Sequence, residues 1–371
     1  MGVMGDGMDV RRDTRILLAI ASVLTLLGLV FIYSSSSVYA LEKFGSAHFF
    51  LKRQALYLIP AFLSFLFFAL APIRFFKRYA PVLFLGSLLL TVMTLIPAFG
   101  FKVHGSYRWL RFAGISVQPS EILKFFLVIY MGFFIERKRE YVTSLAHSYV
   151  PFLIVLGSTF FVLLKQPDFG SVVTLLMTAF ILLFVADFKM VYLLVTMVSA
   201  VPIGIALIFS KTYRLNRILI FLNPWSDPQG RGFQIIQSLI AIGSGKVWGV
   251  GISNSKQKFF YLPMQHTDFI FPILAEETGF VGSCIMLILY FLFCYFGIRI
   301  AMQMKSMFAM FTTLGFVVLI SLQAVVNLMV TTGLLPTKGL GLPFVSYGGT
   351  ALLCLWGMMG LITNFARAEK A

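Results

Sequence analysis

The chain has 371 residues, of which 59% are hydrophobic and only 12% are charged. A water-soluble domain carries about a quarter charged residues, so this composition excludes a soluble globular protein and indicates one membrane domain over residues 1–371. The formal net charge of +16 would suit a nucleic-acid-binding protein, but no such motif is present and the charges lie in short segments between apolar runs. We therefore expect no nucleic acid as a partner and attribute the charge to membrane topology and anionic lipid head groups.

A membrane-spanning helix needs about 20 predominantly apolar residues, and such runs recur along the chain. The first run follows Arg11, Arg12 and Arg15 and is longer than the apolar core of a secretory leader, so we interpret it as a span. The predicted spans cover residues 16–36, 54–72, 80–99, 122–136, 150–165, 171–188, 191–210, 269–299, 307–330 and 345–366. This pattern predicts an all-α, polytopic integral membrane protein with about ten transmembrane helices.

An even number of spans places both termini on the same side of the membrane. With the N-terminus in the cytoplasm, the short inner loops hold dense basic clusters such as Arg137, Lys138 and Arg139, and the positive-inside rule favours this orientation. Many basic residues nevertheless fall on the outer side, where carboxylates are few. An electropositive outer face suits an anionic ligand such as a lipid phosphate, and a solvated basic loop is the alternative.

The segment between spans 7 and 8, residues 211–268, is predicted to be a large structured extracytoplasmic loop. Residues 223–230 have turn composition, and residues 233–242 then form an apolar stretch of about ten residues, too short to span and typical of an interfacial or re-entrant helix. Four glycines follow at positions 243, 245, 249 and 251, where the backbone can turn sharply or approach a ligand closely. Long loops with structure of their own are usually functional.

Asp268 lies where this loop meets the next span. Thr267 or Asp268 would serve as an N-cap, and Pro272 is tolerated in a first helical turn. The Asp268 carboxylate could instead accept a proton from an incoming hydroxyl group, as a general base does. Glu276 would lie about 12 Å deeper along the same helix and roughly 80° around it, where packing is favoured over catalysis.

Two further clusters of ionisable residues lie on the outer side. In the first, Arg108 and Arg111 have no evident acid beside them, which leaves their guanidinium groups available for phosphate. Further along this cluster, Glu121 and Lys124 are three residues apart on one helical face, a spacing at which they can pair. In the second cluster, Asp168 lies in a tight turn between spans, where a structural role such as neutralising Lys124 is favoured.

Residues 335–343 and 346–349 form a Gly- and Pro-rich segment that includes Lys338 and re-enters from the outer side. Irregular backbone at membrane depth is tolerated where it lines a cavity. We therefore expect this segment to face a cavity.

Several short stretches occur together in one order: residues 105–109 (Gly-Ser-Tyr-Arg-Trp), 118–121 (Gln-Pro-Ser-Glu), 166–170 (Gln-Pro-Asp-Phe-Gly), 227–245, 262–263 (Leu-Pro), 266–271 (His-Thr-Asp-Phe-Ile-Phe), 275–277 (Ala-Glu-Glu) and 343–349. Each is weakly specific alone, but the ordered set resembles the SEDS family of peptidoglycan polymerases and covers nearly the whole chain after residue 100. Residues 254–258 and 335–340 resemble the cell-division type, FtsW, more than the elongation type, RodA. Thr278 departs from the Leu usual in the family, and residues 104–106 depart from a frequent Gly-Ala pair.

The resemblance implies a glycosyltransferase that polymerises lipid II, an undecaprenyl-pyrophosphate-linked disaccharide-pentapeptide, at the outer face of the bacterial cytoplasmic membrane. Asp268 matches the family's essential aspartate and would be the catalytic base that takes a proton from the acceptor 4-hydroxyl. The substrate-binding candidates, which would stabilise the departing pyrophosphate, are Arg108, Arg111, Lys256, Lys258 and Lys338. The supporting candidates are Glu121, Lys124, Asp168 and Glu276.

The sequence identifies no cofactor, although a divalent cation, Mg²⁺ or Mn²⁺, could help to stabilise the leaving charge. The expected protein partners are a class B penicillin-binding transpeptidase and other divisome or elongasome membrane proteins. Alternatives to a septal polymerase are a lipid II flippase and the elongation-type polymerase. A flippase predicts charged residues along a path through the membrane, whereas here they gather in the outer half of the chain's spans.

Overall fold

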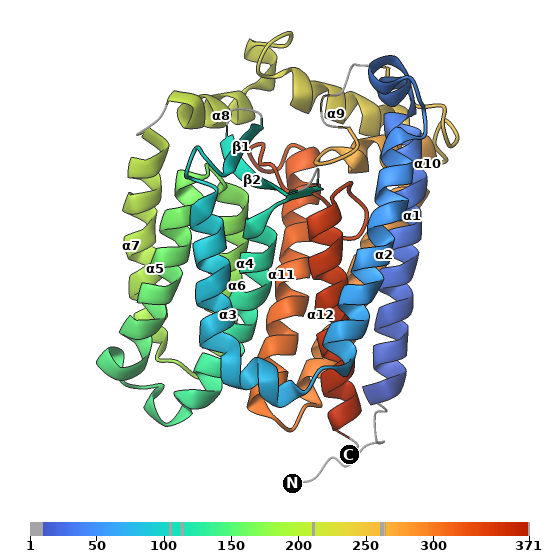
Figure 1. Cartoon of the computed structure of the whole chain (residues 1–371). Coiled ribbons are helices and arrows are strands. Elements are labelled where there is room, and N and C mark those ends of the chain that lie inside the picture. The colour runs from blue at the N-terminus through green and yellow to red at the C-terminus, as the bar shows by residue number, and fades with distance from the viewer. Residues whose placement is uncertain are drawn as a thin grey trace.

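The computed structural model describes residues 10–103, 106–112, 115–209, 212–259, 263 and 265–369. A helix lies in each range predicted to span the membrane: α1 (Val10–Phe44), α2 (Phe49–Leu70), α3 (Ile73–Met93), α4 (Pro119–Arg137), α5 (Val150–Lys165), α6 (Phe169–Val185), α7 (Met190–Phe209), α10 (Ile270–Met302), α11 (Met307–Thr331) and α12 (Gly349–Ala368). Among the described residues, seven helices are long and apolar enough to cross a bilayer, namely α1, α2, α3, α5 with the turn before it, α10, α11 and α12. Because α4, α6 and α7 lie beside them in one bundle (Figure 1), the polytopic helical architecture is confirmed.

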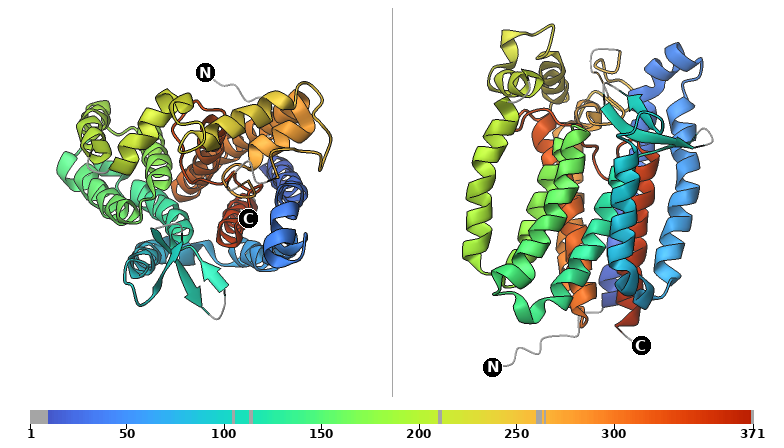
Figure 2. Two further views of the ribbon diagram at one scale, coloured as in Figure 1. Left: turned by 90° about the horizontal axis from the view of Figure 1, so that it is seen from above. Right: turned by 60° about the vertical axis from the view of Figure 1, so that its left-hand side comes forward.

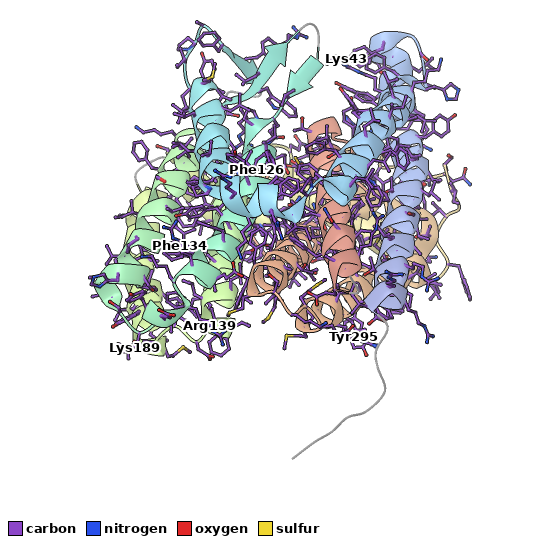
Figure 3. All side chains as sticks on the ribbon, turned by 60° about the horizontal axis from the view of Figure 1, so that its bottom comes forward. Lys43, Phe126, Phe134, Arg139, Lys189 and Tyr295 are labelled. Atoms are coloured by element: carbon purple, nitrogen blue, oxygen red, sulfur yellow. The ribbon has the colours of Figure 1, made fainter. Side chains whose placement is uncertain are left out.

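The bundle has two distinct ends. α1 begins and α12 ends at one of them, the termini end, whereas the loop between α7 and α10 lies at the opposite one, the loop end (Figure 1). This loop contains α9 (Phe233–Ser244), which matches the predicted short apolar helix, and α8 (Thr212–Leu222), which the sequence pattern did not indicate. Arg139 and Lys189 lie at the termini end and Lys43 lies at the other (Figure 3).

α11 forms the centre of the bundle. Of its most apolar 18-residue stretch 72% is buried, against 17% for α2, which therefore presents most of its surface to lipid. Phe308, Phe311 and Phe316 of α11 are each at most 1% exposed. α2 and α12 pack closely because Gly360 has no side chain: an added Cβ would overlap the carbonyl oxygen of Phe65.

The loop end also carries a small antiparallel sheet, which the all-α fold class did not include. β1 (Gly100–Val103), β2 (Ser106–Phe112) and β3 (Ile115–Val117) pair in the order β1-β2-β3. β2 is rich in aromatic residues, which favour strands. Its backbone groups are satisfied by hydrogen bonds to β1 and β3. The sheet lies over α3 at the loop end (Figure 2).

α10 is interrupted at Gly279, whose φ of 69° and ψ of −161° are not helical. The backbone groups on both sides of this kink bond to the glycine-rich part of the preceding loop. Phe280 N donates to Lys246 O (2.8 Å), Val281 N to Val247 O (3.1 Å), Val250 N to Glu276 O (3.0 Å) and Gly251 N to Glu277 O (3.0 Å). The loop segment 246–251 therefore completes the hydrogen bonding of the broken helix.

Residues 332–348, between α11 and α12, follow an irregular path, as predicted for the Gly- and Pro-rich segment. Side chains of three surrounding helices satisfy its backbone groups. Asn327 Nδ2 donates to Leu340 O (2.6 Å), Gln323 Nε2 to Gly341 O (3.0 Å) and the Tyr290 hydroxyl to Pro343 O (2.5 Å), while Gly348 N donates to Gln54 Oε1 (3.2 Å). These bonds hold the segment against α2, α10 and α11 without regular secondary structure.

Candidate active site

A cleft of about 430 Å³ lies at the loop end. Its walls come from α2, the sheet, the start of α4, the turn before α6, the segment before α10 and residues 339–348. Among the described residues, its charged lining side chains are Arg53, Arg108, Glu121, Asp168 and Asp268. Its volume falls within the roughly 300–1,000 Å³ of small-molecule sites. Of the five charged lining residues, all except Arg53 are functional-site candidates from the sequence.

The backbone on which Asp268 sits is held at three successive carbonyls. His266 O accepts from Tyr347 N (3.0 Å), Thr267 O from the Ser346 hydroxyl (2.6 Å) and Asp268 O from Asn327 Nδ2 (2.8 Å). Two of the donors belong to the irregular segment 332–348 and the third to α11. Main-chain anchoring therefore presents the Asp268 side chain to the cleft, and within the described part of the chain no hydrogen bond holds its carboxylate.

Asp268 is not an N-cap, so that alternative is wrong. α10 begins at Ile270, its N-cap residue is Phe269, and no side chain caps it. The carboxylate lies instead beside Gly339: a Cβ added there would be 3.3 Å from Asp268 Oδ2 and 3.7 Å from Arg108 Nη1. Because Gly339 has no side chain, the backbone there can approach both the Asp268 carboxylate and the Arg108 guanidinium, which face the same space.

The electrostatics of this pair suit proton transfer. Burial raises the pKa of Asp268 to about 6, an effect that the Arg108 guanidinium opposes, the Asp168 carboxylate reinforces, and Arg217 opposes more weakly. A carboxylate with this pKa is mostly ionised at neutral pH and still basic enough to accept a proton. Asp268 is thus the described carboxylate whose environment best fits a general base.

Arg108 is oriented by the turn before α6. Its Nε donates to Gln166 O (2.8 Å) and its Nη2 to Pro167 O (2.7 Å), which leaves Nη1 nearest Gly339 and the cleft. Gln166 is itself fixed, because its Nε2 donates to Thr91 O (3.2 Å) and Thr94 Oγ1 (2.5 Å) at the end of α3. One turn thereby links β2, α3 and α6.

Asp168 has the structural role that the sequence favoured, but with another partner. It caps α6, accepting from Ser171 N (3.3 Å) and from the Ser171 hydroxyl (2.8 Å). No ion pair joins it to Lys124 among the described residues. It still lines the cleft, where its charge acts on Asp268.

Glu121 and Lys124 form the predicted pair on one face of α4, at 2.7 Å. Lys124 is 1% exposed and also donates to Gln323 Oε1 of α11 (3.4 Å). Lys124 therefore ties α4 to α11, and Glu121 is the member of the pair that lines the cleft.

Arg111 does not join Arg108 in the cleft. Residues three apart in a strand point to opposite faces, and the Arg111 guanidinium lies 5.0 Å from the ring of Phe101, which itself lines the cleft. Both arginines were predicted to hold one phosphate, and the structure places Arg108 but not Arg111 among the residues that line the cleft.

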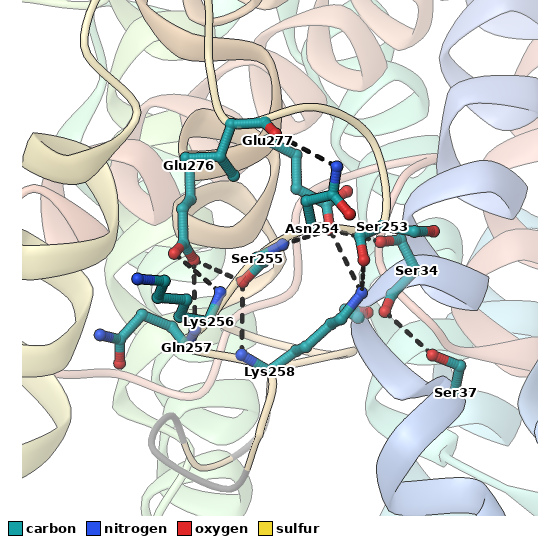
Figure 4. A network of polar contacts seen from close by, with 12 residues as sticks. Ser34, Ser37, Ser253, Asn254, Ser255, Lys256, Gln257, Lys258, Glu276 and Glu277 are labelled. Carbon is teal, nitrogen blue, oxygen red and sulfur yellow. Dashed lines mark hydrogen bonds and ion pairs between the residues drawn. The ribbon is translucent and has the colours of Figure 1, made fainter.

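Glu276, Glu277 and Lys258 belong to a separate polar network (Figure 4). Glu276 accepts from the Ser255 hydroxyl and from Lys256 N (2.9 Å), so it has the packing role that the sequence favoured. Glu277 accepts from the Ser34 hydroxyl of α1 (2.5 Å) and pairs with Lys258 at 3.8 Å.

The two loop lysines are therefore not brought to the cleft. Lys258 is only 4% exposed, donates to Ser253 O, and is neutralised by Glu277. Lys256 is exposed and does not line the cleft. A substrate-binding role for Lys258 is corrected, because its charge is already buried in an ion pair.

Lys338 directly precedes Gly339, at the edge of the cleft. Burial lowers the pKa of Lys338 from its usual value. Its neighbour Thr337 accepts a hydrogen bond from Arg217 Nη1 of α8 (3.2 Å), so α8 brings a further cation to this edge.

His266 lies in the cleft wall but does not suit acid–base work at neutral pH. Its ring lies 4.3 Å from that of Phe50 and 5.9 Å from that of Tyr39. Burial lowers the pKa of His266 to about 4, so the imidazole is neutral.

Sequence reasoning missed the contribution of α2. Arg53 and Tyr57 line the cleft one turn apart, yet this segment reads as the start of an ordinary span. The basic residue at the lip of a span was the available signal. Gly105 and Leu262, from the stretches that carry the family resemblance, lie outside the described residues.

The model of the FtsW/RodA/SpoVE family, described as "Cell cycle protein", matches residues 14–371. The chain belongs to this family. Among curated relatives, the "Probable peptidoglycan glycosyltransferase FtsW" of Geobacter sp. (strain M18) is 40% identical over 94% of this chain and 95% of that protein. "Stage V sporulation protein E" of Bacillus subtilis (strain 168) is 36% identical over 96% of this chain and 97% of that protein.

Solved structures share the fold of this FtsW/RodA/SpoVE family member. A chain from a study titled "Structural coordination of polymerization and crosslinking by a peptidoglycan synthase complex" has a TM-score of 0.79 and 29% identity, covering 95% of this chain and 97% of that one. Rod shape determining protein RodA of Thermus thermophilus has a TM-score of 0.69 and 26% identity, covering 96% and 97%. The family resemblance found in the sequence is thus confirmed.

Proposed function

We propose that this chain is a peptidoglycan glycosyltransferase of the FtsW type, which polymerises lipid II into glycan strands for septal wall synthesis. The observation that carries the proposal is the placement of Asp268 in a cleft beside Arg108, with its pKa raised to about 6. Curated relatives named as peptidoglycan glycosyltransferases FtsW, at about 40% identity over nearly the whole chain, support the reaction class.

Asp268 would act as the general base. Its carboxylate takes the proton from the 4-hydroxyl of the acceptor sugar, and that oxygen forms a bond to the anomeric carbon of the donor. The bond between this carbon and the lipid pyrophosphate breaks, and the electron pair leaves with the pyrophosphate. Arg108 Nη1, on the cleft side of Gly339, would stabilise this charge together with Arg53 of α2, which also lines the cleft.

We place the loop end outside the cytoplasmic membrane and both termini in the cytoplasm. Arg139 and Lys189 lie at the termini end, where the positive-inside rule expects basic loops (Figure 3). The cleft would then open toward the leaflet and solvent in which a lipid-linked sugar presents its head group.

A divalent cation is proposed only as a companion of the substrate. Among the described residues no three His, Cys, Asp or Glu side chains gather as a metal site. The donor's pyrophosphate would therefore supply most of the ligands for such an ion, and none of the steps above depends on it.

We further propose a class B penicillin-binding transpeptidase as partner. The similar solved chain, from the study titled "Structural coordination of polymerization and crosslinking by a peptidoglycan synthase complex", supports this pairing. The exposed outer residues of α9 and of segment 246–252 lie at the loop end, on the side where crosslinking would follow.

A lipid II flippase is disfavoured by the distribution of charge. The buried ionisable side chains among the described residues lie near the two ends of the bundle: Asp13 at the termini end, and Lys124, Asp168, Lys258, Glu276 and Glu277 toward the loop end. A translocation path would need ionisable groups across the middle of the bundle as well.

The test compares wild type and Asp268→Asn in proteoliposomes with lipid II and the cognate transpeptidase, measuring glycan polymerisation and transbilayer movement of lipid II in parallel. Asn keeps the size of the side chain and removes the proton acceptor, so polymerisation should fall by about 10²–10⁴-fold or more. Near wild-type polymerisation by Asp268→Asn would move the base to Glu121 or Asp168. Transbilayer movement without polymerisation by the wild type would sink the proposed function.

A further inference from the structure

A second cavity, of about 490 Å³, lies at the termini end between α1 and α12. It is far from the candidate active site along the bundle axis, because α1 begins and α12 ends there (Figure 1). Its lining residues come from these two helices alone: Arg11, Thr14, Arg15, Leu18, Thr363, Ala366 and Arg367.

The spacing of these residues shows that one face of each helix forms the cavity. On α1 they follow the pattern i, i+3, i+4, i+7, and on α12 the pattern i, i+3, i+4. Three arginines therefore converge on one space from two helices, which is a geometry that local sequence does not reveal.

No carboxylate is among the described lining residues. The nearby Asp13 points away, since residues two apart on a helix differ by about 200° in direction. Asp13 is 3% exposed and pairs with Arg299 of α10 at 3.2 Å, so its charge is directed to a different interface. The cavity consequently has a net positive lining.

The lining also changes character with depth. Leu18 lies seven residues beyond Arg11, about 10 Å further into the bundle. On α12 the deeper lining residue is Thr363, about one turn before Arg367, and its hydroxyl is already bonded to Met359 O (2.7 Å). A cationic rim above an apolar interior matches a molecule with an anionic head and a hydrocarbon tail. A free anion such as inorganic phosphate would use only the rim.

We propose that this cavity binds the phosphate head group of an anionic phospholipid from the leaflet at the termini end, with Arg15 and Arg367 contacting the phosphate. Arginine matches phosphate oxygens in geometry and charge, and basic pockets between transmembrane helices commonly bind such head groups. The acyl chains would lie along Leu18, in continuity with the lipid around α1.

The test measures lipid binding to the purified full chain by native mass spectrometry during titration with dioleoylphosphatidylglycerol or dioleoylphosphatidylcholine. The wild type should retain the anionic lipid preferentially. Arg15→Gln/Arg367→Gln should weaken its affinity by about 30-fold, because both direct contacts to the bound phosphate are lost. Arg15→Lys/Arg367→Lys should restore most of the binding, because the charges remain.

The matched control is Arg12→Gln/Arg74→Gln, which removes two exposed arginines at the same end without touching the cavity. Its affinity for the anionic lipid should stay within about three-fold of wild type. Equal losses in both double variants, equal retention of the two lipids by the wild type, or displacement of the lipid by millimolar inorganic phosphate would each overturn the proposal. Polymerisation activity serves as the folding check, since neither pair belongs to the candidate active site.

Discussion

At the scale of single residues, the main chain of Asp268 fixes its position and the side chain faces the cleft. The backbone carbonyl of Asp268 is held by Asn327, while the carboxylate faces Arg108 across Gly339. Asp168 is different: its carboxylate is engaged in capping α6, and it acts on Asp268 through its charge. Two acids in one cleft thus have separate roles, which burial sets for Asp268 and hydrogen bonds set for Asp168.

This arrangement predicts the pH dependence of polymerisation. A general base works when it is ionised, so kcat/KM should rise with pH through a limb near pH 6, the pKa to which burial raises Asp268. Arg108 lowers this pKa and Asp168 raises it. Removing the cation in Arg108→Gln should therefore move the limb to higher pH, whereas Asp168→Asn should move it to lower pH.

The measurement is the pH profile of kcat/KM for the wild type and both variants. Asn caps a helix about as well as Asp, so Asp168→Asn should keep the start of α6 intact. Limbs that shift in the same direction, or do not shift, would show that the titrating group is not Asp268.

At the scale of elements, strand and helix geometry decides which residues share a surface. Arg108 and Arg111 are separated by the pleat of β2, and only Arg108 lines the cleft. On α10, the kink at Gly279 opens hydrogen-bonding groups that segment 246–251 fills. Next to this segment, Glu276 and Glu277 hold residues 255–258, so the long loop is anchored to the helix that follows Asp268.

The two faces of β2 predict unequal effects of two arginine substitutions. Arg108→Ala should reduce polymerisation roughly 10- to 100-fold, because the variant loses the hydrogen bonds to the turn before α6 and the proposed charge-assisted bonds to the pyrophosphate. Arg111→Ala should change it by no more than about two-fold, as expected for an exposed residue outside the cleft. The measurement is the polymerisation kinetics of the two single variants, and Arg108→Lys should restore part of the activity. A larger loss in Arg111→Ala than in Arg108→Ala would contradict this assignment.

The kink predicts a stability effect that differs between two glycines. In Gly279→Ala the added Cβ would overlap Gly249 N and Val247 O, at a positive φ of 69°, so the fold should lose about 2 kcal/mol or more. Gly86→Ala, in α3, meets nothing within 4 Å and should be neutral or slightly stabilising. The Tm of each variant is measured by thermal unfolding in detergent. Equal Tm values would mean that segment 246–251 can move to accommodate the added Cβ without loss of stability.

At the scale of the whole molecule, chemistry and topology are separated along the bundle axis. The loop end carries the cleft, the sheet and the polar network, and the termini end carries basic loops and the cavity between α1 and α12 (Figures 1 and 3). The central helix, α11, reaches from one end to the other, supplies Gln323 to the cleft wall, and holds two backbone carbonyls of that wall through Asn327. A rigid, buried helix thereby supports an irregular segment that has no regular structure of its own.

The orientation of this axis is testable by labelling. In a background with Cys284, Cys294 and Cys354 replaced, Gln229→Cys, exposed in the long loop, should react with a membrane-impermeant maleimide from outside intact cells. Arg139→Cys, at the termini end, should react only after permeabilisation. The reverse pattern would invert the proposed topology and place the cleft in the cytoplasm.

The sequence alone determined the features that depend on local composition or local spacing. Each predicted span contains a helix, because a segment that crosses the bilayer needs a continuous run of apolar residues and such a run is visible in the sequence. The short helix α9 and the pair of Glu121 with Lys124, which are three positions apart, were predictable for the same reason.

Only the tertiary structure decided which distant segments meet. Nothing in the spacing of the chain shows that Arg108 bonds to a turn 58 residues away, or that Ser34 bonds to Glu277. Local propensity also missed β2, and with it the separation of Arg108 from Arg111. Lipid specifies that helices form, but the packing of their small and polar residues specifies their neighbours, and that packing is what brings Arg53, Arg108 and Asp268 to one cleft.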